Sequence, residues 1–237
     1  MISETMQPAP ELLLLGASRG LGAALALEVA KRGWKVVGTV RGDGRTPLHD
    51  AADLHGGRIE VESVDVTRPE QIAALAERLS GRTFTALVVN AGAGSADPLA
   101  TMLDTAPEEF MRVMLTNAYG VVRCVEALQY LVQPDGLIAI MSSGQGSLAN
   151  NLDGRNDLYR SSKAALNQLM RSFAARQASG CRALVLMAPG WIRTELGGAA
   201  APYSVEESAP KITDVLLGTI GTPGLRYLDR DGRVVPW

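Results

Sequence analysis

Cysteine, histidine and surplus positive charge are all scarce in this sequence of 237 residues. The two cysteines, Cys124 and Cys181, each lie in an apolar stretch, which favours buried, reduced thiols over a disulfide bridge. The two histidines, His49 and His55, have no cluster of cysteines or acids at metal-ligand spacing around them, so we predict solvated loop histidines and no metal site. The composition therefore favours a core that needs neither disulfides nor metals.

The sequence also lacks a basic field and a long hydrophobic run. Its formal net charge is −2, which excludes the broad positive surface that holds a nucleic-acid backbone or an anionic membrane. The apolar run 12–15 is too short for a signal peptide or a membrane span, and the segment before it is polar. We therefore expect a cytoplasmic protein with no nucleic-acid partner and no membrane partner.

Internal repeats, low-complexity tracts and linkers are also missing, so residues 1–237 are expected to form a single domain. Short apolar runs alternate with helical patterns, which predicts an α/β, doubly wound (Rossmann) fold with a mostly parallel seven-stranded sheet and helices on both faces. Residues 42–57 are interpreted as loop with at most one short helix, and residues 191–210 as a mobile substrate flap. The strands are expected at 11–15, 35–40, 58–64, 86–89, 137–141, 182–187 and 225–229, and the helices at 21–32, 69–79, 107–130, 157–178 and 210–217.

A glycine-rich turn, Gly16-Ala-Ser-Arg-Gly20-Leu-Gly22, joins the first predicted strand to the first predicted helix. Glycines let the backbone turn tightly and let a pyrophosphate approach the helix N-terminus, where free N–H groups favour negative charge. The alternative is a purely structural bend, but the position between strand and helix favours dinucleotide binding.

Two arginines near this turn predict which dinucleotide is bound. Arg41 follows the second strand, where many NAD-binding folds place an acid for the ribose hydroxyls, and Arg19 lies in the turn itself. Two guanidinium groups suit a 2′-phosphate, which favours NADP(H) over NAD(H); the alternative is a pair of solvated surface arginines.

Tyr159 and Lys163 are four residues apart on the predicted helix 157–178 and so share one face. A nearby ammonium favours the phenolate, so we expect Lys163 to lower the pKa of Tyr159 toward working pH and to suit it for general acid/base chemistry. Alone, such a pair occurs by chance in many helices.

The pair is one of seven motifs that follow one another along the chain. These are the Gly16–Gly22 turn, Asp65, Asn90-Ala91-Gly92, Asn117, Ser142-Ser143, Tyr159 with Lys163, and Pro189-Gly190 with Thr194. In these motifs and their order the sequence resembles the short-chain dehydrogenase/reductase family over nearly its whole length, and it is most similar to the family's C-factor-like and Sniffer-like, carbonyl-reductase-like branch.

The resemblance implies a role for each matched residue. Tyr159 would transfer the proton while a hydride moves to or from the nicotinamide, Ser143 would hydrogen-bond the substrate oxygen, and Asn117 would hold a water that passes protons to Lys163. Asp65 would meet the adenine, and Ile192 and Thr194 the carboxamide of the nicotinamide. The residues implied to bind the cofactor are Gly16, Ser18, Arg19, Gly20, Leu21, Gly22, Arg41, Asp65, Val66, Asn90, Ala91, Gly92, Tyr159, Lys163, Pro189, Ile192 and Thr194.

The sequence leaves several alternatives open. Ser143 and Tyr159 are 16 positions apart, a few more than is usual in the family, so Ser142 or Ser147 could fill the serine's role. Trp191, Tyr203 and Met187 line either an apolar pocket beside the flap or the core. We expect reversible reduction of a carbonyl to an alcohol by a homodimer or homotetramer; a non-catalytic dinucleotide sensor is the rival, and the substrate is not specified.

Overall fold

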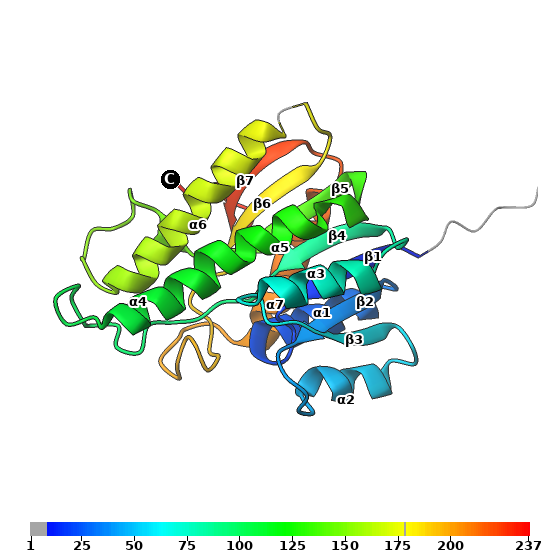
Figure 1. Ribbon diagram of the computed structural model, residues 1–237, viewed down its shortest axis with the longest axis horizontal. Helices are drawn as coiled ribbons and strands as arrows, with labels where there is room; N and C mark the ends of the chain where they lie inside the picture. The colour runs from blue at the N-terminus through cyan, green and yellow to red at the C-terminus, as the bar shows by residue number, and fades with distance from the viewer. Residues whose placement is uncertain (1–8, 178) are drawn as a thin grey trace, which may run out of the picture.

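The structure is a computed structural model that describes residues 9–177 and 179–237. At its centre, seven strands form one parallel sheet (Figure 1). The strand order is β3-β2-β1-β4-β5-β6-β7, and every neighbouring pair is parallel, which confirms the predicted doubly wound fold. The strands are β1 (Glu11–Leu15), β2 (Lys35–Val40), β3 (Ile59–Ser63), β4 (Phe84–Val89), β5 (Val132–Met141), β6 (Ala183–Ala188) and β7 (Gly224–Asp229).

Helices cover both faces of the sheet (Figure 1). One face carries α1 (Gly20–Lys31), α2 (Pro47–Leu54) and α7 (Val205–Gly218), and the other carries α3 (Pro69–Arg78), α4 (Pro107–Met114), α5 (Val121–Leu128) and α6 (Asp157–Arg176). This layering follows from parallel strands, because each return to the same edge of the sheet needs a crossover helix.

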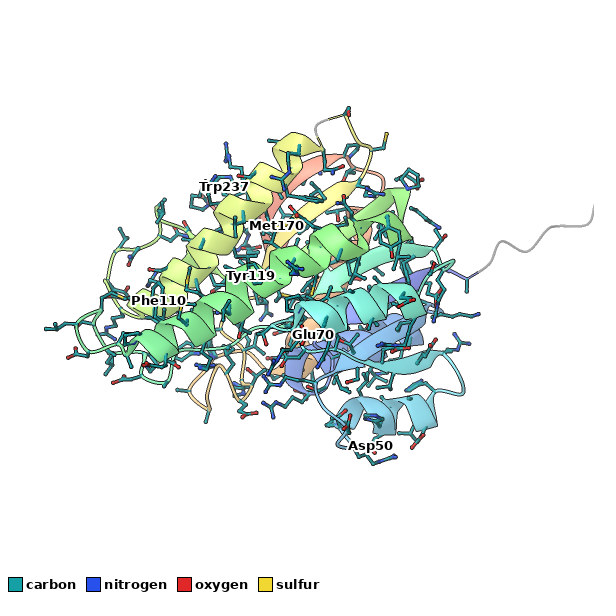
Figure 2. All side chains as sticks on the ribbon, viewed as in Figure 1. Asp50, Glu70, Phe110, Tyr119, Met170 and Trp237 are labelled. Atoms are coloured by element: carbon teal, nitrogen blue, oxygen red, sulfur yellow. The ribbon has the colours of Figure 1, made fainter. Side chains whose placement is uncertain are left out.

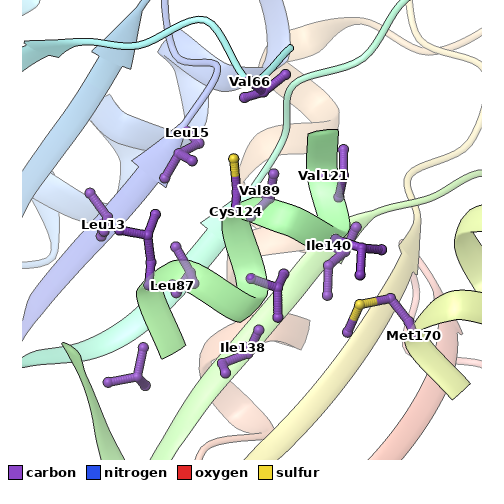
Figure 3. Close-up of a cluster of buried hydrophobic side chains, with 14 of the residues drawn as sticks. Leu13, Leu15, Val66, Leu87, Val89, Val121, Cys124, Ile138, Ile140 and Met170 are labelled. Carbon is purple, nitrogen blue, oxygen red and sulfur yellow. The ribbon is translucent and has the colours of Figure 1, made fainter. Parts of the chain in front are cut away.

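The alternation of side chains along each strand divides the core into two layers. On β1, Leu13 and Leu15 face the layer under α5 and α6, whereas Leu12 and Leu14 face the layer under α1 and α7. Figure 3 shows the first layer, where side chains of β1, β4 and β5 pack against Val121 and Cys124 of α5 and Met170 of α6. Nearly every central strand residue is apolar because both faces of the sheet are buried.

The long helix predicted for 107–130 is interrupted, and this prediction was wrong in detail. A π-helical segment, η1 (Leu115–Gly120), separates α4 from α5. A 3₁₀ turn, η2 (Gln129–Leu131), follows α5, and β5 begins directly after it at Val132. A Cβ on Gly120 would lie 2.4 Å from the carbonyl oxygen of Val66, so the loop after β3 packs directly on the π segment. Such bulges are frequent at functional sites.

Capping explains two further helix starts. Residues 47–54 form the one short helix that the sequence allowed within 42–57, and it is opened by Pro47 at its first turn and by Thr46, whose backbone N–H donates to Nδ1 of His49. His49 is therefore a capping residue and not a solvated loop histidine. α7 begins at Val205, five residues before the predicted start, because Ser204 and Glu207 cap it reciprocally, and Pro210 lies inside the helix.

The predicted end of α6 near residue 178 lies outside the described residues, as do residues 1–8 of the polar N-terminal segment. Cys124 is buried, and burial raises the pKa of its thiol to about 12. Cys181 is exposed, contrary to the prediction, because it lies two residues before the start of β6. None of the helices described is long and apolar enough to cross a bilayer.

Candidate active site

The site residues gather where the strand order reverses, between β1 and β4. Sheets of this kind bind ligands outside the carboxyl ends of the strands at such a switch point. The backbone N–H of Asn90, after β4, donates to the carbonyl of Leu15 in β1 at 2.8 Å. The side-chain amide of Asn90 donates to the carbonyl of Gly16 at 2.7 Å. Asn90 therefore ties the two strands together.

The glycines of the turn are required by close packing. Gly16 has φ +83°, and a Cβ there would lie 2.6 Å from the backbone nitrogen of Ala91. A Cβ on Gly22 would lie 2.1 Å from the carbonyl oxygen of Gly16. These distances are below any ordinary contact, so only glycine lets the turn, α1 and the loop after β4 approach one another.

The N-terminus of α1 fits a phosphate group. Arg19 is its N-cap and makes no side-chain capping bond, and the first turn of α1 has no acidic residue. The first N–H groups of a helix have no intrahelical partner, and the helix dipole adds positive potential there. The turn thus combines free donors, a cationic neighbour and glycines that leave the backbone accessible.

The side chains implied to bind the rest of a dinucleotide lie along the same edge of the sheet. Asp65 follows β3, and burial opposes its ionisation, but hydrogen bonds from the hydroxyl and N–H of Thr67 outweigh burial and hold its pKa below the usual value. The charge of Arg41 acts on Asp65 in the same direction. Arg41 is exposed at the end of β2.

Arg19 forms an ion pair with a flap residue. Its Nη2 lies 2.9 Å from Oε2 of Glu195, and both side chains are about two-thirds exposed, at 66% and 70%. Thr194 is close to the glycine turn, because a Cβ on Gly20 would lie 3.5 Å from its Cγ2. The hydroxyl of Thr194 accepts from the N–H of Gly197, and Ile192 is buried. Residues 191–203 thus contact the glycine turn through Thr194 and Glu195.

The three candidate serines have different surroundings. Ser142 is buried and its hydroxyl donates to Oδ1 of Asn167 at 2.6 Å. Ser147 is buried and its hydroxyl donates to the backbone oxygen of Trp237 at 3.2 Å. Ser143 is half-buried and its hydroxyl bonds the side chain of Tyr159. Of the three, the surroundings of Ser143 fit the predicted role best.

Tyr159 and Lys163 do share a face of α6, but the predicted effect on the pKa of Tyr159 is wrong for this structure. The Nζ of Lys163 lies 5.8 Å from the centroid of the Tyr159 ring and donates to the carbonyl of Met141 at 2.9 Å. Burial raises the pKa of Tyr159 to about 12, although the hydrogen bond with Ser143 opposes this, and burial lowers the pKa of Lys163 to about 8. Desolvation therefore outweighs the attraction that the sequence suggested.

Asn117 lies in the π segment and is fully buried. Its Nδ2 donates to the carbonyl of Ala93 and to the hydroxyl of Ser162, and its Oδ1 accepts from the N–H of Ala93. A Cβ on Gly92 would lie 3.5 Å from both Oδ1 of Asn117 and Nζ of Lys163, so the two groups are neighbours. Asn117 joins the loop after β4 to α6, and its hold on a water stays a prediction.

Comparisons with known proteins agree with this geometry. A family model described as enoyl-(acyl carrier protein) reductase matches residues 16–223. A short-chain dehydrogenase/reductase of Burkholderia multivorans, solved with bound NADP, is 57% identical, with a TM-score of 0.96 over 97% of this chain and 100% of that one. The chain belongs to the short-chain dehydrogenase/reductase family.

Two more solved structures place the chain near carbonyl reductases. A carbonyl reductase of Pseudomonas aeruginosa in complex with NADP is 34% identical, with a TM-score of 0.89, over 97% of this chain and 100% of that one. The carbonyl reductase Sniffer of D. melanogaster is 25% identical, with a TM-score of 0.85 over the same shares. The resemblance to the Sniffer-like branch is thereby confirmed.

Sequence reasoning missed two residues of this short-chain dehydrogenase/reductase. Asn156 precedes α6 with φ +64°, the one positive value among the described non-glycine residues, and its side chain bonds Ser95 and Gln145. The signal was an asparagine just before a helical pattern, a residue type that tolerates this conformation. Tyr227 of β7 reaches the serine loop by a contact across 84 positions, which no local pattern indicates.

The apolar residues proposed beside the flap are divided by the structure. Met187 is fully buried in the core and so does not line a pocket. The ring of Tyr203 stacks on the guanidinium of Arg230, 3.9 Å from its centroid, and Trp191 is exposed. In residues 9–177 and 179–237, no three His, Cys, Asp or Glu side chains gather closely enough to hold a metal ion.

Proposed function

We propose that this short-chain dehydrogenase/reductase is an NADP(H)-dependent carbonyl reductase that interconverts a carbonyl compound and an alcohol. The observation that carries the proposal is the meeting of Ser143, Tyr159 and Lys163 beside Gly92, in the loop after β4. The NADP held by the Burkholderia multivorans and Pseudomonas aeruginosa proteins supports the choice of dinucleotide.

The chain's own residues suit the proton half of this reaction. When bound, NADPH supplies a hydride to the carbonyl carbon, and the electron pair of the C=O π bond moves to the oxygen. Tyr159, with a pKa of about 12, is protonated at neutral pH and gives its proton to that oxygen. The hydroxyl of Ser143 donates a hydrogen bond to the same atom, so both donors act where negative charge develops.

Lys163 and Asn117 support the proton donor. A cationic Lys163 near the ring stabilises the phenolate that Tyr159 leaves after proton transfer. We propose that Asn117 also holds a water through which Lys163 passes a proton back to Tyr159, because its Oδ1 and the Nζ of Lys163 face the same small glycine, Gly92. In the oxidation of an alcohol the same groups act in reverse.

The cofactor contacts are proposed from the fit of the turn. The N–H groups at the start of α1 would hold the pyrophosphate, Arg19 and Arg41 the 2′-phosphate, and Asp65 the adenine. Residues 90–92 and Pro189 would line the cofactor, and Ile192 and Thr194 would reach the carboxamide of the nicotinamide. Ser18, Leu21 and Val66 adjoin these groups in the same turns.

We also infer the setting in which the enzyme works. One sheet runs through the described chain, which supports a single cofactor-binding domain with residues 191–210 as its substrate flap, of which 205–210 form the start of α7. Two unbridged cysteines support a reducing, cytoplasmic compartment. The resemblance supports a homodimer or homotetramer.

Replacement of the proton donor tests the function. With NADPH and a panel of ketones, aldehydes and quinones, Tyr159→Phe should lower turnover by about 10²- to 10⁴-fold, while NADPH affinity, measured by fluorescence titration, stays within about twofold. Tyr119→Phe is the matched control, because the Tyr119 hydroxyl lies on an exposed helix face, where it bonds Arg123, and its loss should change neither quantity.

The same panel separates the enzyme from the sensor. Wild-type protein that binds NADPH but turns over no compound of the panel would favour the dinucleotide sensor. Turnover retained by Tyr159→Phe would remove Tyr159 from the reaction.

A further inference from the structure

Tyr227 is a buried phenol that lies behind the serine loop and is not one of the groups that transfer a proton in the proposed reaction. It is 2% exposed, and its hydroxyl donates to the backbone carbonyl of Ser143. The side chains of Ser142 and Asn167 lie close to this hydroxyl and oppose the effect of burial on its pKa. Burial raises the pKa of Tyr227, so the group stays protonated and keeps its hydrogen to donate.

The carbonyl of Ser143 is the point at which the loop turns away from β5. It accepts the N–H of Gly146 at 2.9 Å as well as the phenol, and this closes the 3₁₀ turn η3 (Gly144–Gly146). Ser143 itself is extended, with φ −161° and ψ 146°. Because a peptide unit is planar, fixing this carbonyl restricts the rotation that sets the direction of the Ser143 side chain.

The same loop, residues 142–147, is also hydrogen-bonded to α6. The side-chain amide of Asn167 donates to the carbonyl of Gly146 at 3.2 Å, and its Oδ1 accepts from Ser142. A Cβ on Gly146 would lie 3.0 Å from the Cβ of Lys163, so the loop packs directly on the helix that carries Tyr159 and Lys163. These contacts fix the position of the loop relative to α6.

The segment after β7 holds the far end of the loop. The backbone oxygen of Trp237 accepts from the hydroxyl of Ser147 at 3.2 Å and from the N–H of Ala149 at 3.0 Å. The Trp237 ring lies 5.5 Å from that of Tyr227, and Arg171 of α6 lies 4.9 Å above it. Figure 2 shows Trp237 beside α6. β7 and its tail therefore contact the loop at both ends.

We propose that Tyr227 is a positioning residue for the proposed reaction, which holds the carbonyl of Ser143 so that the serine hydroxyl faces Tyr159. The inference rests on the proposed function in that Ser143 is the second donor to the substrate oxygen. In this proposal Tyr227 acts on the substrate through Ser143, and its charge interaction with Tyr159 adds to the effect of burial in raising the pKa of Tyr159.

A double-mutant cycle tests this dependence. Tyr227→Phe removes one oxygen and keeps the ring in its packing against Trp237. We expect its kcat to fall on the order of tenfold, with NADPH affinity unchanged, because the loss falls on the transition state rather than on cofactor binding. In a Ser143→Ala background, Tyr227→Phe should cause no further loss, since the group it positions is gone.

Tyr130→Phe is the matched control. The Tyr130 hydroxyl also donates to a backbone carbonyl, that of Ala76 at 3.3 Å. Ala76 belongs to α3, so this bond does not involve the serine loop. This variant should keep the wild-type kcat. Full kcat in Tyr227→Phe, or losses that multiply in the double variant, would overturn the inference.

Amide hydrogen exchange supplies a readout that does not depend on activity. Tyr227→Phe should speed the exchange of the Gln145 and Gly146 amides, and Tyr130→Phe should not, because both donors are bonded to Ser143. Unchanged exchange overturns the inference even if the protein is active. Absence of turnover in the wild type overturns the proposed function alone, and faster exchange would still show that Tyr227 holds the loop.

Discussion

The two halves of the site are built in different ways. The cofactor turn after β1 is held by backbone contacts, in which missing side chains at Gly16 and Gly22 let main chains approach. The proton site after β5 is held by side-chain bonds that cross long stretches of sequence, such as Asn117 to Ser162 and Tyr227 to Ser143. A phosphate needs N–H groups that any residue provides, whereas a proton donor needs one side chain in one direction.

This difference also appears in the electrostatics. The turn faces solvent with exposed arginines, so its charges are screened and adaptable. The proton site buries Lys163 at 3% exposure, and its pKa falls to about 8. Screening limits what a surface charge contributes, whereas burial makes the charged state of Lys163 costly. The following predictions test this contrast.

Gly22→Ala should have the largest effect, because it adds an atom where backbones meet. Its Cβ would lie 2.1 Å from the carbonyl oxygen of Gly16 and 2.7 Å from the amide of Asn90, so the turn must move. We expect NADPH affinity to fall by about 100-fold or more. The free energy of unfolding should fall by about 1–3 kcal/mol. Fluorescence titration and urea denaturation measure the two.

Gly218→Ala is the control for this prediction, because a Cβ at the end of α7 meets nothing within 4 Å. NADPH affinity should be the same as in the wild type. Wild-type affinity in Gly22→Ala would show that the turn is not a close-packed backbone cradle.

Lys163→Met should reveal the cost of the buried charge in the proton site. The pKa of Lys163 is lowered from 10.5 to about 8, so between these pH values the unfolded chain holds a proton that the folded chain has released. The contribution of Lys163 to the free energy of unfolding therefore rises with pH across this window. The advantage of methionine over lysine should shrink by about 3 kcal/mol from pH 7 to 10.5.

Urea denaturation of both proteins at several pH values measures this slope. Lys31→Met changes an exposed lysine at the end of α1 and should leave the wild-type slope unaltered. Parallel curves for wild type and Lys163→Met would contradict a depressed pKa for Lys163.

The contrast also explains what the sequence could predict. The glycine turn, Asp65 and Asn90 each follow an apolar strand, so local pattern was enough to place them at one edge of the sheet. Tyr159 and Lys163 were placed by helix periodicity alone. The predicted lowering of the Tyr159 pKa was wrong, because desolvation depends on which segments cover the side chain, and those segments are distant in the sequence.

Errors concentrate where long-range contacts override local pattern. The helical pattern of 107–130 gave no sign of the π segment, which exists where the loop at Val66 packs on Gly120. The apolar stretch around Cys181 predicted a buried thiol, but β6 starts two residues later and leaves it exposed. Tyr227 and Asn156 gain their roles only when β7 and the loops meet.

The smallest expected effect concerns the contact between the turn and the flap. Glu195 pairs with Arg19, one of the two arginines proposed for the 2′-phosphate, and both side chains are largely exposed. Exposed ion pairs contribute little free energy. In Glu195→Gln the Arg19 guanidinium no longer has to leave a carboxylate to bind the 2′-phosphate, so NADPH affinity should rise by only about two- to threefold. NADH affinity should not change, since NADH lacks the phosphate. Titration of both dinucleotides at low ionic strength measures the difference.

Glu206→Gln is the control, because it removes the same charge from an exposed position in the first turn of α7. It shows how much the loss of any negative charge changes the affinity for each dinucleotide. If Glu195→Gln improves NADPH and NADH binding equally, Arg19 does not read the 2′-phosphate. Arg41 alone would then carry the discrimination. A gain confined to NADPH would instead show that the flap and the cofactor compete for one guanidinium, so that the exposed half of the site is the half that adjusts.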